Sequence, residues 1–305
     1  MAEIVLKTNH LSKTYGNQKV LDDVCMTVEK GDIYGFVGEN GSGKTTVIRA
    51  ITGLITPTSG DFELYGVNSN SPEILKQREK IGAVVEAPSV YPSLSARDNL
   101  HVIQMLLNIN DEEKIKKSLD MVGLSDLYND KKKAGNYSLG MRQRLGIAMA
   151  LIASPDFLVL DEPLNGLDPE GIVEMRNLIL SLNRDFGITF LISSHILTEL
   201  SLVATKYGII SKGHIIKEIT KEEIEKNCQK SIIVEASDIE ALHNALLTVV
   251  DESELVRLGN GYQINSNVEY NKILGCVSSV NISNIKTVET NIEDYYLYII
   301  KEGRR

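Results

Sequence analysis

The sequence is poor in cysteine and has no long apolar run. Its three cysteines, Cys25, Cys228 and Cys276, are far apart and form no CxxC pair. This usage predicts no disulfide framework and favours a reducing compartment. No stretch approaches the ~18–20 apolar residues of a membrane span, and the beginning, Met-Ala-Glu-Ile-Val-Leu-Lys, has no apolar segment typical of a signal peptide. We therefore expect a soluble chain that would reach a membrane only through a partner.

The chain also lacks an excess of positive charge. Its formal net charge is -9, which argues against broad binding to the phosphate backbone of nucleic acid. The short basic run Lys131–Lys133 lies in a polar connector and is interpreted as a solvated loop. The length of 305 residues suits one large domain with an appendage, or two domains.

Short apolar runs alternate with longer amphipathic stretches over about the first 220 residues. The runs predicted as strands are Val5–Leu6, Ile33–Val37, Ile81–Val85, Phe157–Leu160, Ile188–Ile192 and Tyr207–Ile210. The stretches predicted as helices are Thr45–Ile51, Arg97–Leu107, Asp111–Val122, Met141–Ala153 and Pro169–Asn183. This alternation predicts an α/β layered domain with a parallel sheet.

Two regions depart from that alternation. From about residue 88 to 155 the periodicity is helical, which predicts a helical insertion between two core strands. The composition changes near Thr220, where a charged helical segment begins. We therefore expect a main domain over residues 1–220 and an α+β accessory domain over 221–305, with a hairpin turn at Gly259–Gly261 and no evident chemistry.

The stretch Gly38-Glu-Asn-Gly-Ser-Gly-Lys-Thr45 fits the pattern G-x-x-x-x-G-K-[ST]. It follows a predicted strand and opens a predicted helix, which is the context that a phosphate-binding loop requires. Lys44 would reach the outer phosphates, and the Thr45 hydroxyl would bind Mg²⁺. The residues expected to contact a nucleotide here are Gly38, Glu39, Asn40, Gly41, Ser42, Gly43, Lys44, Thr45 and Thr46.

Two carboxylates follow the apolar run Phe157–Leu160. Asp161 is predicted to hold Mg²⁺ through water, and Glu162 to polarise the attacking water as general base. A strand that ends in Asp-Glu is a weak signal alone, but together with the phosphate loop it predicts a nucleotide hydrolase.

The stretch Tyr137-Ser-Leu-Gly-Met-Arg-Gln-Arg144 resembles the Leu-Ser-Gly-Gly-Gln signature of the nucleotide-binding subunits of ATP-binding cassette (ABC) transporters. Ser138 and Gly140 match it. The departures are Tyr137 for Leu, Leu139 for the first Gly and Met141 for Gln. Taken alone, Ser138 could simply cap a helix. The resemblance covers about residues 3–220 and implies the fold of a P-loop ABC cassette, a RecA-like core with antiparallel β and helical subdomains.

The same resemblance assigns roles to three further residues. Tyr15 would stack on adenine, Asp168 in Leu164-Asn-Gly-Leu-Asp168 would lie at a dimer contact, and His195 would be the switch histidine that senses the γ-phosphate. In the family, two domains face each other head to tail, with each ATP between one phosphate loop and the other signature. A homodimer in the ATP-bound state is therefore implied, with ATP and Mg²⁺ as cofactors.

Glu86 occupies the position at a strand exit where the family usually has a glutamine that contacts Mg²⁺ and the attacking water. A carboxylate could still ligate Mg²⁺, which prefers oxygen ligands. The alternative is a solvated loop glutamate. A glutamate at this position, the signature variant and the C-terminal appendage resemble the ATPases of lantibiotic-immunity and bacitracin-resistance transporters.

The sequence thus predicts an ATPase subunit on the cytoplasmic face of a bacterial membrane, working with separately encoded permease subunits to expel an antimicrobial peptide. Three alternatives stay open: export of another small molecule, a non-transport ABC-type ATPase acting on ribosomes or DNA, and a regulatory ATP-binding partner. The second usually has two cassettes or a long coiled-coil insertion, and neither is evident in this sequence.

Overall fold

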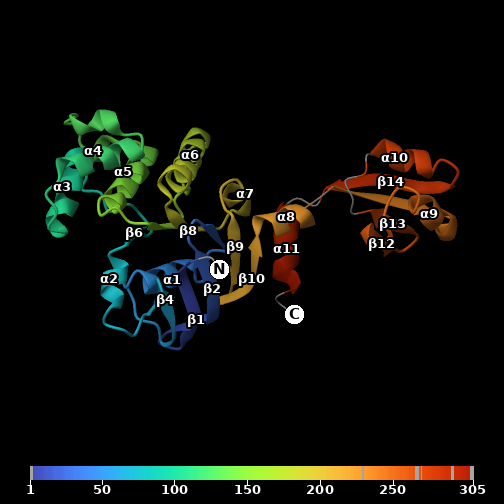
Figure 1. Ribbon diagram of the computed structural model, residues 1–305, viewed down its shortest axis with the longest axis horizontal. Helices are drawn as coiled ribbons and strands as arrows, with labels where there is room; N and C mark the ends of the chain where they lie inside the picture. The colour runs from blue at the N-terminus through green and yellow to red at the C-terminus, as the bar shows by residue number, and fades with distance from the viewer. Residues whose placement is uncertain (1–2, 229, 265–267, 269, 290–291, 303–305) are drawn as a thin grey trace. The chain divides into compact units, whose positions relative to one another are not determined.

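The computed structural model describes the chain except for residues 1–2, 229, 265–267, 269, 290–291 and 303–305 (Figure 1). The chain forms two compact units, Met1–Lys221 and Glu222–Arg305, each described by itself below. None of the helices in the described part of the chain has both the length and the apolar character needed to cross a membrane.

A six-stranded sheet organises the N-terminal unit, in the order β10-β9-β3-β8-β7-β6. All neighbours pair in parallel except β9 and β10, which are antiparallel. Every residue of β3, β7 and β8 is buried, which explains why these strands are continuous apolar runs in the sequence. The strands are β3 (Ile33–Val37), β6 (Ile81–Val84), β7 (Phe157–Asp161), β8 (Thr189–Ser194), β9 (Lys206–Ser211) and β10 (His214–Thr220).

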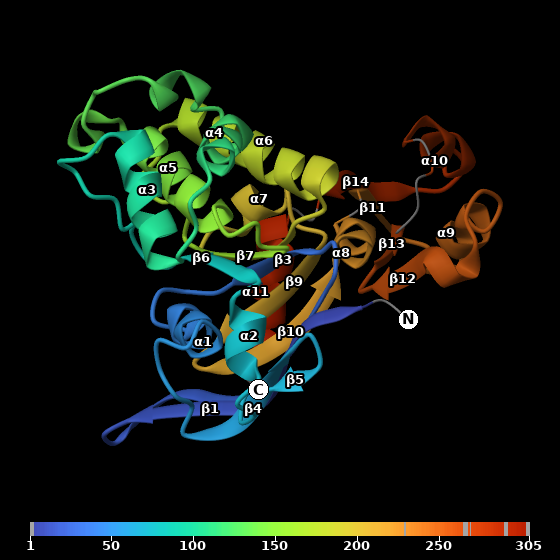
Figure 2. The same cartoon turned by 60° about the vertical axis from the view of Figure 1, so that its left-hand side comes forward.

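A second, antiparallel sheet has the order β2-β1-β4-β5. Its strands are β1 (Ile4–Tyr15), β2 (Gln18–Glu29), β4 (Ser59–Leu64) and β5 (Val67–Asn68). Only Val5–Leu6 of this sheet was predicted from apolar runs, because polar residues on the solvated face interrupt the rest of the strands. The helix α1 (Lys44–Ile51) shares one core with both sheets, through Val47 and Ile48, and lies between them in Figure 2.

The segment between β6 and β7 is helical, and Figure 2 shows α3, α4 and α5 grouped together. Their first turns are capped by the side chains of Ser95, Asp111 and Ser138, which accept hydrogen bonds from backbone N–H groups. The helices here are α3 (Ala96–Leu106), α4 (Glu112–Met121), the short 3-10 turns η1 (Ser125–Tyr128) and η2 (Ala134–Asn136), and α5 (Leu139–Leu151). The remaining helices of the unit are α2 (Ile74–Arg78), α6 (Pro169–Phe186) and α7 (Leu197–Leu200).

Glu112 ties three elements of this helical segment together. Its Oε1 lies 2.7 Å from Arg97 Nη2 and 2.8 Å from His101 Nε2, and Tyr128 OH donates to its Oε2 at 2.8 Å. The hydrogen bond from Arg97 is the main reason why the pKa of the Glu112 carboxyl falls from 4.5 to about 2. The ionised carboxylate therefore stabilises the folded state above the ordinary pKa, and this contribution is lost as pH falls toward 2.

Replacing Glu112 with Gln should therefore lower the free energy of unfolding by about 1 kcal/mol at neutral pH, since solvent screening at a 39% exposed side chain reduces the effect of the pKa shift. Thermal unfolding of the intact chain at neutral pH and at about pH 3 checks this, because the difference from wild type should shrink in acid. The matched control is Glu113→Gln, whose partner Lys116 is also exposed, with an expected change of a few tenths of a kcal/mol. An equal loss in both variants would contradict the role of Glu112.

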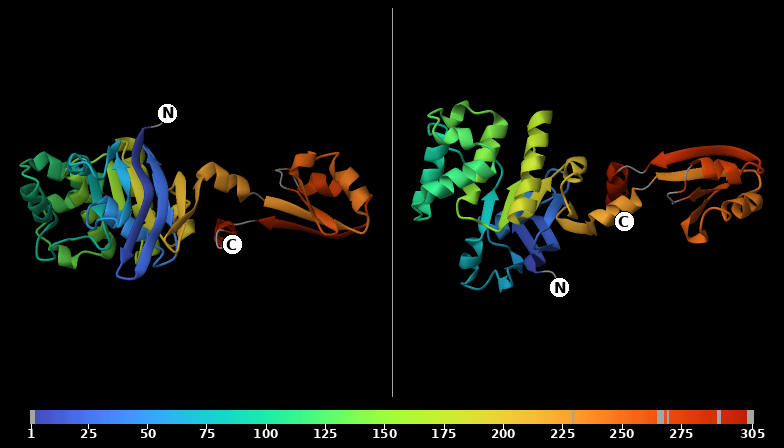
Figure 3. Two further views of the ribbon diagram at one scale, coloured as in Figure 1. Left: turned by 90° about the horizontal axis from the view of Figure 1, so that it is seen from below. Right: turned by 45° about the horizontal axis from the view of Figure 1, so that its top comes forward.

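The C-terminal unit, orange to red in Figure 3, is an α+β fold. Its four-stranded sheet has the order β12-β13-β11-β14. The helix α9 packs on β11 and β13, and α10 packs on α9, so that Val234, Leu242 and Ile273 share a small core. Its elements are α8 (Lys221–Asn227), β11 (Lys230–Ala236), α9 (Ile239–Leu246), η3 (Glu252–Glu254), β12 (Leu255–Leu258), β13 (Gly261–Ile264), α10 (Tyr270–Cys276), β14 (Ile282–Glu289) and α11 (Ile292–Glu302).

Candidate active site

The glycine-rich loop connects the buried end of β3 to the first turn of α1. Gly38 has no room for a side chain, because a Cβ there would lie 2.4 Å from the carbonyl oxygen of Ile210 and 2.6 Å from Ser42 Oγ. Gly43 has φ +110°, and its Cβ would meet Leu21 of β2. Glycine is therefore required at both ends of the loop. The loop places backbone N–H groups at the N-terminus of α1, where they can donate hydrogen bonds to a phosphate group.

Lys44 of this loop is almost completely buried. Its Nζ donates to the carbonyl oxygens of Gly38 at 2.7 Å and Glu39 at 3.3 Å, and lies 3.2 Å from Glu162 Oε1. The other oxygen of Glu162 lies 2.7 Å from His195 Nδ1. The structure thus brings together Lys44, Glu162 and His195, which are far apart in the sequence. The carboxylate of Glu162 lies between the ammonium of Lys44 and the imidazole of His195.

Ser193 fixes the acidic pair at the end of β7. Its hydroxyl donates to Asp161 Oδ1 at 2.5 Å and accepts from the backbone N–H of Glu162 at 2.9 Å. Asp161 and Ser193 are both almost completely buried. Glu162 has φ +50°, in the left-handed region that is unfavourable for a side chain with a Cβ. Backbone in this region is typical of functional sites, where surrounding contacts impose it.

Ser193 and Glu199 are site residues that the sequence did not reveal. Ser193 lies in the quoted Ser193-Ser-His195 stretch, but nothing in that pattern distinguishes a bridging serine from an ordinary one. Glu199 follows His195 by four residues. Burial raises the pKa of its carboxyl, His195 lowers it and Glu162 raises it again, so the three groups interact electrostatically.

Glu86 lies just beyond β6, and its carboxylate forms an ion pair with Arg49 of α1. The side chain of Glu86 is 59% exposed and that of Arg49 is 39% exposed. An ion pair with this exposure is weak and is easily exchanged for other partners. Glu86 also has a left-handed backbone, with φ +63°. Arg49 gave no signal in the sequence, and the pair shows that Glu86 has a partner other than bulk water.

The predicted signature residues form a separate site. Ser138 caps α5 through the N–H of Met141, and Asp168 caps α6 through the N–H of Gly171. Both line a pocket of about 460 Å³ together with Gly140. Among the described residues, those that line this pocket come from the start of α5, the turn at 166–168 and α6, and none from the phosphate loop. One chain therefore presents two distinct surfaces, one with Lys44 and one with Ser138.

Tyr15 lies at the last position of β1, next to the turn into β2. Its side chain is 44% exposed, and Lys13 Nζ lies 5.1 Å from its ring centroid. The strand β2 packs on the phosphate loop through Leu21, so the hairpin that holds Tyr15 borders this loop. An aromatic side chain with this exposure is able to stack on a planar base.

Comparison with known proteins assigns the chain to a family. The family model described as ABC transporter matches residues 21–165. The bacitracin transport ATP-binding protein BcrA of Bacillus licheniformis is 40% identical over 98% of both chains. The chain belongs to the ABC transporter ATP-binding proteins. The predicted cassette fold is thereby confirmed, and ATP binding and hydrolysis follow from family membership.

Two further proteins similar to this ABC protein each match about 70% of the chain. The lantibiotic transport ATP-binding protein SrtF of Streptococcus pyogenes is 43% identical over 70% of this chain and 90% of its own. The solved dimeric structure of the ATP-binding cassette MJ0796 in a post-hydrolysis state, bound to ADP and Pi, is 25% identical, with a TM-score of 0.63 over 71% of this chain and 98% of that chain.

Proposed function

We propose that this ABC protein powers the export of an antimicrobial peptide of the bacitracin or lantibiotic type and so protects a bacterial cell. The observation that carries this proposal is the similarity to bacitracin transport protein BcrA, which spans 98% of both chains and so includes the C-terminal unit. Similarity to the lantibiotic transport protein SrtF, at 43% identity over 70% of this chain, supports the same class of cargo. Glu86 in place of the usual glutamine adds a further point of support.

Hydrolysis would depend on the contacts around Glu162. Lys44, held in the loop by two carbonyl oxygens, would neutralise the outer phosphates of ATP. Glu162 would accept the proton of the attacking water, with Ser193 fixing its backbone and His195 its carboxylate. The His195 ring, held through Nδ1, would leave its second nitrogen for the γ-phosphate.

The loop and the carboxylates fit a nucleotide with a magnesium ion. Ser42 Oγ is buried and has no hydrogen-bond partner among the described residues, as expected of a group that meets a ligand oxygen. Thr45, Asp161 and Glu86 would supply oxygen ligands of the kind that Mg²⁺ prefers, directly or through water. Mg²⁺, when bound, would offset the negative charge of the phosphates and polarise them.

The two separate surfaces of the chain support a head-to-tail homodimer in the ATP-bound state. Ser138, Gly140 and Asp168 would complete the site of a second copy, whose own phosphate loop faces them. Separately encoded permease subunits would hold the dimer at the cytoplasmic face of the membrane. The solved cassette MJ0796 is dimeric, which agrees with this arrangement.

Deleting the gene in its native host should reduce tolerance to bacitracin or a lantibiotic, while wild-type protein supplied in trans restores it. The matched control is the Glu162→Gln protein, which should be present at the same level and restore nothing. Tolerance is measured as the minimal inhibitory concentration of each peptide, alongside unrelated small antibiotics. Unchanged tolerance to the peptides with altered tolerance to another compound would contradict the proposed cargo but not the ATPase.

A further inference from the structure

Four register shifts interrupt the pairing of β1 with β2, and the middle two are bulges in opposite strands. Between the pairs Thr8↔Met26 and Leu11↔Val24, two residues of β1 lie opposite one residue of β2. Between Leu11↔Val24 and the next pair, Lys13↔Leu21, two residues of β2 lie opposite one residue of β1. Bulges re-aim side chains and are frequent beside functional sites. These two lie within a few residues of each other and involve His10, Asp23 and Cys25.

The backbone at the bulges is held in an unusual conformation. His10 has φ +50° and Asp23 has φ +60°, both in the left-handed region. The N–H of Asp23 donates to Ser12 Oγ at 3.0 Å. Gly60 of β4 approaches the carbonyl oxygen of His10 so closely that a Cβ there would lie 2.1 Å from it. Contacts with neighbouring strands therefore impose the left-handed backbone of His10 and Asp23, and the exposed side chains of these residues do not cause it.

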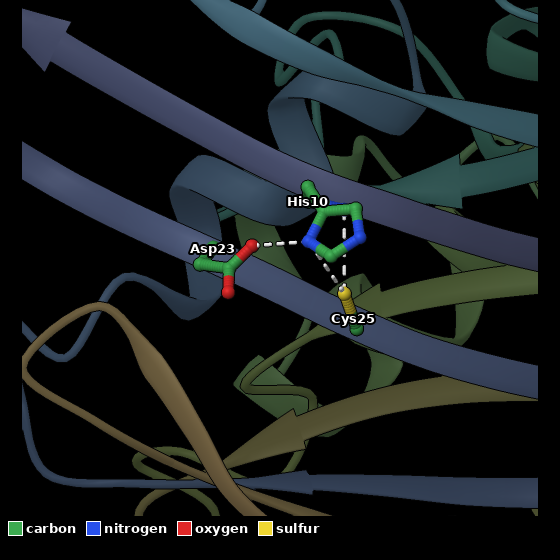
Figure 4. A group of neighbouring side chains, drawn as sticks. All are labelled: His10, Asp23 and Cys25. Carbon is green, nitrogen blue, oxygen red and sulfur yellow. Dashed lines mark hydrogen bonds and ion pairs between the residues drawn. The ribbon is translucent and has the colours of Figure 1, made fainter.

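The three side chains converge on one point at the surface (Figure 4). His10 Nδ1 lies 2.5 Å from Asp23 Oδ1 and 3.8 Å from Cys25 Sγ, and all three candidate ligand atoms lie within 4.8 Å of one another. The backbone N–H of His10 also donates to Cys25 Sγ at 3.3 Å. An imidazole, a carboxylate and a thiol thus meet in an exposed position.

The geometry does not suit a nucleophilic triad. Such a triad uses the two ring nitrogens of histidine on opposite sides, one for the nucleophile and one for the carboxylate. Here the sulfur and the carboxylate oxygen both face Nδ1. When a thiol and a carboxylate face the same ring nitrogen, one cation can bind all three groups in place of the proton that they would otherwise share.

We propose that His10, Asp23 and Cys25 form a surface site for a divalent cation of the zinc class. Zinc takes thiolate, imidazole and carboxylate ligands at about 2.0–2.3 Å, which places ligand atoms about 3.3–3.8 Å apart in a tetrahedral site. The Cys25–His10 separation already fits, and the exposed His10 and Asp23 side chains need to separate by about 1 Å. Water would occupy the fourth position, so loading is reversible and releases protons.

Titration of the intact, nucleotide-free protein with Zn²⁺ alone tests the site, with Mg²⁺ in excess to occupy oxygen-only sites. Wild type should bind one Zn²⁺ in competition with a chromogenic chelator, and Co²⁺ should give a thiolate-to-metal charge-transfer band. His10→Asn, Asp23→Asn and Cys25→Ser should each weaken Zn²⁺ binding at least tenfold. Asn tolerates the left-handed conformation, so the first two variants keep the bulges.

The matched control is Cys228→Ser, which removes another thiol and should leave the affinity and the Co²⁺ band unchanged. The Co²⁺ band should disappear in Cys25→Ser, and circular dichroism should confirm that each variant is folded. A variant that combines His10→Asn, Asp23→Asn and Cys25→Ser should lose the site. Wild-type Zn²⁺ binding no stronger than that of this combined variant, or a Co²⁺ band that persists in Cys25→Ser, would overturn the proposal. The proposed transport function is independent of either result.

Discussion

Replacing Glu162 with Gln should reduce the rate of ATP hydrolysis by about 10²–10⁴-fold while ATP binding is retained. The amide keeps the shape of the side chain but cannot accept a proton from water. It also loses the charge that faces Lys44 at 3.2 Å and His195 at 2.7 Å. Phosphate release under saturating ATP and Mg²⁺ measures the loss, and binding of a fluorescent ATP analogue measures what is retained.

The same variant should accumulate the ATP-bound dimer, because the step that dissolves it is blocked. Size-exclusion chromatography with ATP should therefore show a species of twice the monomer mass, which ADP does not produce. Glu240→Gln, at an exposed position of the C-terminal unit, is the matched control and should behave as wild type. Undiminished turnover in Glu162→Gln would remove Glu162 as the general base, whatever the oligomeric state.

Replacing Glu86 with Ala should lower Mg²⁺-dependent turnover by about tenfold and raise the Mg²⁺ concentration for half-maximal activity, because one oxygen ligand is lost. Glu86→Gln should lose less, since an amide oxygen can still ligate the ion. Arg49→Met should act in the opposite direction on the Mg²⁺ requirement, because it removes the partner that holds the carboxylate of Glu86 in this structure. Turnover measured across a Mg²⁺ titration gives all three results.

Arg257→Met provides the control for loss of an exposed arginine and should leave the Mg²⁺ requirement unchanged. If both Glu86 variants keep wild-type turnover and Mg²⁺ dependence, the carboxylate has no role at the metal. A rise in the Mg²⁺ requirement in Arg49→Met would mean that the ion pair positions Glu86 for the metal rather than withholding it.

Local sequence patterns determined much of the core. The phosphate loop was predictable because a buried strand, glycines in restricted conformations and a helix start lie next to each other in the chain. Buried parallel strands were predictable because both of their faces are covered, so that each is one continuous apolar run. The predicted helical insertion is occupied by three helices whose caps, such as Ser95 and Asp111, are encoded within a few residues.

The long antiparallel hairpin was missed for the opposite reason. One face of β1 and β2 is solvated, so polar residues alternate with apolar ones, and bulges shift that alternation within the strands. A shift in register moves side chains to the other face. The convergence of His10, Asp23 and Cys25 depends on two such shifts, and no spacing rule in the sequence indicates it.

The sequence by itself determined that the chain has a phosphate loop, an acidic pair at a strand end and the features of an ABC cassette, because these depend on neighbouring residues. Only the tertiary structure decided which side chains meet: Ser193 bridges the acidic pair, His195 contacts Glu162, and Arg49 pairs with Glu86. These contacts join strands and helices far apart in the chain. Their formation depends on sheet order and register, which packing of the whole unit selects.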